Sequence, residues 1–120
     1  MATVVQAVDR QELLKRVEML YPEALDQISH AVDFAAAAHG DQARASGEPY
    51  IIHPIEVAGI LADLRLDVPT IIAGLLHDTP EDTSVTLDDV RREFGDTVAN
   101  IVRMSIVRMS IVRMSLMKKY

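Results

Sequence analysis

Residues 70–78 read Thr-Ile-Ile-Ala-Gly-Leu-Leu-His-Asp, and this stretch decides the fold. Pro69 precedes it and suits the first turn of a helix, so we expect a helix from Thr70 to about Asp78. The helix ends in adjacent histidine and aspartate side chains, which can converge on one ion. Its apolar residues, which recur at helical spacing and should be buried, are Ile71, Ile72, Leu75 and Leu76.

Three further helices are expected before this segment. Asp9 followed by Glu12 resembles a capping box and begins the first of them. Pro22 begins the second, which ends at Gly40, and Pro54 begins the third. The apolar residues expected on their buried faces are Leu13, Leu14, Val17 and Leu20, then Leu25, Ile28, Ala31, Val32 and Ala35, then Val57, Ile60, Leu61 and Leu64.

Two shorter helices are expected after the deciding segment. Thr86 is predicted to cap an amphipathic helix over residues 87–94, and Gly95 should end it. Asp96 is then predicted to cap a last helix.

The composition agrees with helices and excludes several classes of protein. The chain has 120 residues, the size of one domain or part of one, with 49% hydrophobic but only 4% aromatic residues. It contains no cysteine, which excludes disulfides and zinc-thiolate sites and is compatible with a reducing cytoplasm. A net charge of −6 argues against nucleic-acid binding, and the apolar runs are too short to span a membrane.

The residues with chemical potential cluster around two histidines. His53 stands before Pro54 after a long polar segment, and His77 with Asp78 ends an apolar helix. Two helix ends meeting across a core would bring His53, His77 and Asp78 together. Imidazole and carboxylate ligands suit a divalent ion such as Mn²⁺, Fe²⁺, Co²⁺ or Zn²⁺.

An acidic pair, Glu81 and Asp82, follows one helical turn after the His-Asp pair. Two interpretations remain open from the residues alone. The pair forms a solvated acidic turn, or it positions a metal-activated water and accepts its proton. His30 is predicted to be a surface or packing residue, and His39 to support the loop after Gly40.

Several longer stretches are similar to one known family. Residues 39–54 read His-Gly-Asp-Gln-Ala-Arg-Ala-Ser-Gly-Glu-Pro-Tyr-Ile-Ile-His-Pro, and residues 76–83 read Leu-His-Asp-Thr-Pro-Glu-Asp-Thr. With residues 57–62, 85–90 and 94–96, they closely resemble the hydrolase domain of the RelA/SpoT family. Those are the stringent-response enzymes that make and degrade (p)ppGpp. The resemblance covers about residues 10–103.

This resemblance implies an all-α, HD-domain-like helical bundle that acts in the cytoplasm. It implies hydrolysis of the 3′-pyrophosphate of (p)ppGpp, with Mn²⁺ as the cofactor. Carried over by position, His53, His77 and Asp78 would be metal ligands. Glu81 and Asp82 would orient and activate the attacking water.

The resemblance also implies residues that bind the guanine nucleotide. Arg44 would stack on the base, a sensible contact between a guanidinium plane and an aromatic face. Ser46 would contact the same pocket. Family members often carry a lysine after the matching arginine, whereas this sequence has Ala45.

The C-terminal part departs from the family pattern. The family's fourth metal ligand is an aspartate on a later helix, but this sequence has no Asp, Glu or His after Asp96. Instead, Ile-Val-Arg-Met-Ser occurs three times over residues 101–115, and a five-residue period fits neither a helix face nor a strand face. We therefore expect a C-terminally incomplete HD domain over residues 1–103 and an atypical tail over residues 104–120.

Three functional hypotheses follow from these observations. The chain is the N-terminal part of a (p)ppGpp hydrolase, impaired by the missing ligand. Alternatively, it is an HD phosphohydrolase for another nucleotide. As a third reading, it is an inactive fragment that forms homo-oligomers through its apolar tail.

Overall fold

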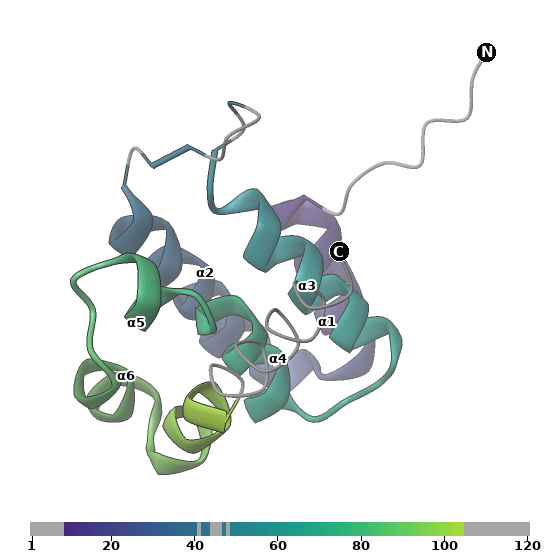
Figure 1. Cartoon of the computed structure of the whole chain (residues 1–120). Helices are drawn as coiled ribbons and strands as arrows, with labels where there is room; N and C mark the ends of the chain where they lie inside the picture. Colours follow the sequence, from purple (N-terminus) through teal and green to yellow (C-terminus); the bar gives the residue numbers. More distant parts are fainter. Residues whose placement is uncertain (1–8, 41, 44–46, 48, 105–120) are drawn as a thin grey trace, which may run out of the picture.

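The structure is a computed structural model that describes residues 9–40, 42–43, 47 and 49–104. Within them the chain forms a helical bundle (Figure 1). Apart from an isolated bridge between Ala43 and Pro49, the described residues contain no β-structure, which confirms the all-α class. The helices are α1 (Arg10–Leu20), the 3₁₀ helix η1 (Pro22–Ala24), α2 (Leu25–His39), α3 (Ile52–Asp63), α4 (Val68–Leu76), α5 (Thr79–Asp82), α6 (Leu87–Phe94) and residues 96–104.

Side-chain caps fix where several helices begin. Asp9 accepts a hydrogen bond at 2.8 Å from a backbone N–H three residues later, and Asp67 accepts a similar bond at 3.1 Å. Thr86 and Asp89 form a complete capping box at the start of α6. The predicted caps at Asp9 and Thr86 are therefore confirmed.

Some predicted boundaries need correction. α3 begins at Ile52, two residues before Pro54. α4 ends at Leu76 and not at Asp78, because the Thr79 hydroxyl donates a hydrogen bond at 2.8 Å to the Leu76 carbonyl as the chain turns. Asp96 does not cap the last helix, since it is already helical and forms an ion pair with Arg91 at 3.0 Å.

The core is built around α4, which lies in the middle of the bundle in Figure 1. Every residue from Ile71 to Leu76 is buried, and α4 packs against α3 and α2. α1 also packs against α3 and α2, so each of these helices covers two others. Burial of each large aliphatic side chain contributes about 1.5–3 kcal/mol, and the short α4 therefore depends on its neighbours for stability.

The predicted buried face of α3 is wrong in part. Ile60 is 58% exposed and Leu64 is 65% exposed. The buried positions include Ala58 and Ala62, because α3 lies between α1 and α4 and small residues let the helices approach closely.

The C-terminal expectations lie largely beyond the described part. In residues 96–104, Val98, Ala99 and Val102 join the core. Most of the repeated tail, residues 105–120, lies outside the described residues, and its self-association stays a prediction. Across the described part of the chain, no helix has the length and apolar character needed to cross a bilayer.

Candidate metal centre

The candidate site lies where three helices begin or end. His53 is the second residue of α3, and His77 and Asp78 form the turn that joins α4 to α5. Glu81 and Asp82 close the single turn of α5. The hydrogen bond from the buried Thr79 to the Leu76 carbonyl holds this turn. Four side chains with acidic or imidazole groups therefore lie on one short segment: His77, Asp78, Glu81 and Asp82.

His53, His77 and Asp78 converge as the sequence predicts. One carboxylate oxygen of Asp78 lies 2.9 Å from Nε2 of His77, and the other lies 3.7 Å from Nε2 of His53. The two imidazole rings are 5.5 Å apart, centroid to centroid. One ligand atom from each residue lies within 4.8 Å of the others, which is close enough for a shared ion.

The orientation of His77 suits a metal ligand. Its Nδ1 donates a hydrogen bond at 2.6 Å to the Gly74 carbonyl, which can only accept. In the neutral ring, Nε2 is then unprotonated and faces Asp78. Such second-sphere bonds commonly fix the tautomer of metal-binding histidines. Two nitrogens and a carboxylate therefore fit a divalent transition ion.

Burial and charge act against each other in this cluster. Asp78 is 5% exposed and His77 is 8% exposed. Burial lowers the pKa of His77, but the hydrogen bond to Asp78 and the negative charges of Asp78 and Glu81 outweigh it, so the pKa is raised. Burial raises the pKa of Asp78, yet the bond to His77 and the charges of His77 and His53 leave it lowered.

The acidic pair lies beside this cluster. Asp78, Glu81 and Asp82 each place an oxygen within 4.8 Å of the others. Glu81 and Asp82 are both exposed, in contrast to Asp78. They can therefore meet water and a substrate, while His77 and Asp78 stay shielded.

Gln42 and Tyr50 form hydrogen bonds to Asp82, and His39 contacts both of them. Gln42 and Tyr50 were not predicted from the sequence. The Tyr50 hydroxyl donates a hydrogen bond at 2.5 Å to the Asp82 carboxylate, and the Gln42 amide donates one at 2.8 Å to the Asp82 carbonyl. His39 bonds to Gln42 and stacks on Tyr50, as expected for a residue that supports this segment. Gln42 and Tyr50 belong to a polar segment without a periodic signal, so no pattern in the sequence distinguishes them from their neighbours.

His39 also carries an orphan atom. Its side chain is 3% exposed, and its Nε2 has no hydrogen-bond partner among the described residues. A buried polar atom left without a partner costs about 1–3 kcal/mol. The position therefore favours a role beyond packing.

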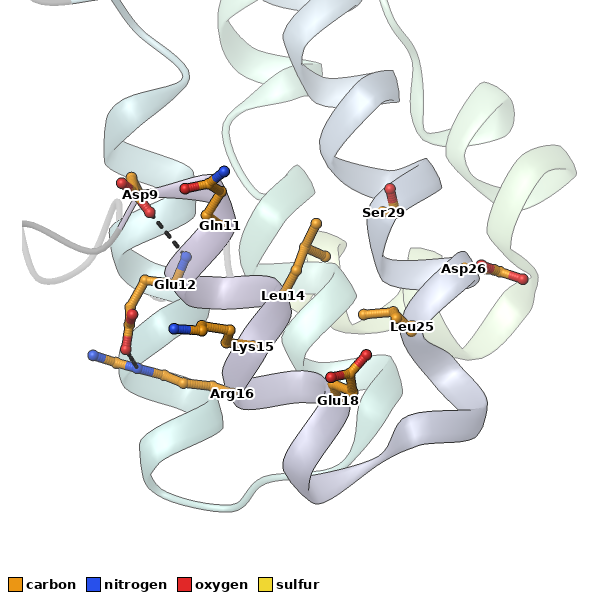
Figure 2. Close-up of a pocket in the computed structure, with 10 residues that line it drawn as sticks. All are labelled: Asp9, Gln11, Glu12, Leu14, Lys15, Arg16, Glu18, Leu25, Asp26 and Ser29. Carbon is orange, nitrogen blue, oxygen red and sulfur yellow. Dashed lines mark hydrogen bonds and ion pairs between the residues drawn. The ribbon is translucent and has the colours of Figure 1, made fainter.

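Arg44 and Ser46, the predicted nucleotide contacts, lie outside the described residues. His30 is exposed, as predicted, and pairs with Glu93 at 2.6 Å, away from the cluster. A hollow of about 890 Å³ lies between α1 and the start of α2 (Figure 2). None of the residues that line it, among them Glu12, Lys15 and Asp26, belongs to the metal cluster or the acidic pair.

Comparison with known proteins gives consistent matches. Residues 31–117 match the family model described as HD domain. Over 95 residues, the chain is 47% identical to a guanosine-3′,5′-bis(diphosphate) 3′-pyrophosphohydrolase of Aquifex aeolicus, covering 79% of this chain and 14% of the relative. It is 49% identical over 83 residues to a probable GTP pyrophosphokinase of Mycobacterium leprae, covering 68% of this chain and 10% of the relative.

A GTP pyrophosphokinase of Streptomyces coelicolor is 53% identical over 78 residues, which cover 65% of this chain and 9% of the relative. The chain thus spans at most 14% of the length of these three relatives. The similarity to these proteins confirms the predicted resemblance to the RelA/SpoT family.

Proposed function

Because the chain belongs to the HD-domain family, we propose that it carries the metal-binding part of a hydrolase that removes the 3′-pyrophosphate of (p)ppGpp. The observation that supports this proposal most directly is the convergence of His53, His77 and Asp78, with a pair of exposed carboxylates one turn further on. The name of the Aquifex relative supports the choice of substrate.

In this proposal His53, His77 and Asp78 hold a Mn²⁺ ion. Such an ion supplies Lewis acidity and lowers the pKa of water, which provides a nucleophile near neutral pH. Because the pKa of His77 is raised, a proton would compete with the ion for Nε2, and the affinity for the ion would fall as pH falls.

Glu81 and Asp82 then orient the attacking water and accept its proton, since a carboxylate within hydrogen-bond reach of water can act as a general base. Arg44 stacks on the guanine base and Ser46 contacts the nucleotide. The substrate in this proposal is the guanine nucleotide (p)ppGpp. The proposed location of the protein is the cytoplasm. In this proposal the three ligands named above hold the ion weakly, so we expect turnover to be slow.

The test is a titration of the full chain with ppGpp in the presence of Mn²⁺. Release of GDP and pyrophosphate is followed by anion-exchange chromatography, and binding is followed by ppGpp-dependent thermal stabilisation. We expect specific binding and turnover below about 1 per second, the low end of the ordinary enzyme range. Asp78→Asn should abolish the hydrolysis, and Arg44→Ala should weaken binding without changing the melting temperature of the free chain.

Two outcomes would contradict this proposal. If neither binding nor hydrolysis of ppGpp occurs at millimolar Mn²⁺, the assigned substrate is wrong. If ATP or another nucleotide is hydrolysed faster than ppGpp, the chain is an HD phosphohydrolase of different specificity.

A further inference from the structure

Gln42 and Tyr50, two described residues of the segment before α3, both form hydrogen bonds to Asp82 of α5. Gln42 Nε2 donates to the backbone carbonyl of Asp82 at 2.8 Å, and Tyr50 Oη donates to its Oδ2 at 2.5 Å. The Tyr50 N–H also donates to the Gln42 carbonyl at 3.0 Å, and a bridge joins Ala43 to Pro49. Backbone contacts therefore hold Gln42 and Tyr50 next to each other, independently of their hydrogen bonds to Asp82.

His39 supports both of these side chains from the end of α2. Its Nδ1 donates to Gln42 Oε1 at 3.1 Å, because the Gln42 amide nitrogen is already the donor to Asp82. Its ring stacks on Tyr50 with centroids 4.5 Å apart and an angle of 22° between the planes. A second bond, from the Gln42 N–H to the His39 carbonyl at 3.0 Å, fixes the same pair.

Asp82 needs such support because its own helix supplies little. α5 has four residues, too few to be stable alone, and the Asp82 side chain is exposed. An exposed carboxylate ordinarily samples several rotamers. Here the hydrogen bond from Tyr50 to Oδ2 favours one of these rotamers.

We propose that His39, Gln42 and Tyr50 are positioning residues that hold the Asp82 carboxylate in the orientation in which it accepts a proton. The role of Asp82 as acceptor rests on the proposed function, whereas the support itself rests on the contacts above.

The first test removes a single hydroxyl. Tyr50→Phe keeps the ring that stacks on His39 but deletes the bond to Asp82. We expect kcat for ppGpp to fall by about 10-fold to 100-fold, the cost of a misplaced catalytic group, with KM and Mn²⁺ affinity within about 2-fold. The matched control is Tyr21→Phe, whose hydroxyl donates to the Leu66 carbonyl at 3.1 Å. It should leave kcat unchanged.

A double-mutant cycle shows whether Tyr50 acts through Asp82. In an Asp82→Asn background, Tyr50→Phe should cause no further loss of kcat, because the group that it positions is already disabled. Independent, multiplicative losses would overturn the proposal. So would a change in KM with kcat unaltered, because that would make Tyr50 a substrate contact.

The second test needs neither metal nor activity. Amide hydrogen exchange of the metal-free chain compares the Tyr50 N–H with the Tyr21 N–H, which donates to the Val17 carbonyl at 2.6 Å. Tyr50→Phe and Asp82→Ala should each speed exchange at position 50 by about 10-fold or more and leave position 21 unchanged. Unaltered exchange at position 50 would overturn the positioning role. If exchange responds but the wild-type chain does not act on ppGpp, the support of Asp82 stands and the proposed function fails.

Discussion

Gly74→Ala should destabilise the chain, because this glycine lies where α4 touches α3. A Cβ atom at position 74 would lie 2.5 Å from Cδ1 of Leu61 and 3.5 Å from Cγ1 of Val57. The second distance is an ordinary contact, but the first is far below the optimum of about 3.5–4.0 Å for two carbon atoms. Leu61 is partly buried and packs against the core, so its side chain must turn away from position 74 and lose part of that packing.

Two opposing terms set the size of the effect. Overpacking of a core contact costs about 1–3 kcal/mol. Replacing a helical glycine with alanine raises the free energy of unfolding by about 0.5–1 kcal/mol, because alanine loses less conformational entropy on folding. The free energy of unfolding should therefore fall by up to about 2 kcal/mol. When Leu61→Ala removes the offending atom, the same change at Gly74 should instead stabilise the chain by about 0.5–1 kcal/mol.

Urea unfolding of the wild type, both single variants and the double variant measures this coupling. All four proteins are unfolded in the absence of metal, so differences in Mn²⁺ binding do not affect the measured free energies of unfolding. The expected coupling free energy is about 1–3 kcal/mol, with unchanged m-values. Additivity within about 0.5 kcal/mol would refute the close α3–α4 contact. Because the Gly74 carbonyl also orients His77, Mn²⁺ affinity should fall in Gly74→Ala and recover in the double variant.

Other parts of the structure lead to three further predictions. Thr86→Ala removes the cap of α6 and should cost about 1 kcal/mol in thermal unfolding at neutral pH. The hydrogen bond from the Thr86 backbone N–H lowers the pKa of Asp89, so the stability that the Asp89 carboxylate contributes exists above the unfolded value near 4 and is lost as pH falls through the lower folded value. The loss of stability caused by Asp89→Ala should therefore shrink over that range in an acid titration. His53→Ala and His77→Ala should each abolish the Mn²⁺-dependent rise in melting temperature, whereas His30→Ala should leave that rise intact.

Local signals account for the parts of the fold that the sequence predicted well. A cap depends on residues three positions apart, so Asp9 and Thr86 could be identified from the sequence alone. The apolar face of α4 was also predictable, because a helix buried at the centre carries large aliphatic residues along its length. The predicted end of α4 at about Asp78 was two residues too late, since the turn depends on a hydrogen bond from Thr79 to Leu76 that the residue types alone do not indicate.

The error in α3 has a different origin. Hydrophobic periodicity weighs large side chains, and it placed Ile60 and Leu64 in the core. The fully buried positions of α3 include Ala58 and Ala62, which carry little hydrophobic signal but permit close approach of the neighbouring helices. Which of two apolar stripes faces inward depends on the neighbouring helices, and that information is not local.

The same distinction separates the two halves of the candidate site. His53, His77 and Asp78 could be grouped in advance because each lies at a helix end and each is a metal-ligand type. Arg44 and Ser46 came from the family resemblance alone. The hydrogen-bond partners of Asp82 could not be identified from local sequence patterns, since Gln42 lies 40 positions and Tyr50 lies 32 positions from Asp82 in the chain.

The site thus depends on two kinds of support. Core packing fixes the candidate ligands, because His53 lies on α3, His77 directly follows α4, and these two helices touch closely at Gly74. The exposed Asp82 has no such core beneath it and is held by hydrogen bonds from Gln42 and Tyr50. A substitution in the core should therefore change metal affinity and stability together. A substitution in the segment before α3 should alter the chemical step while the core remains folded.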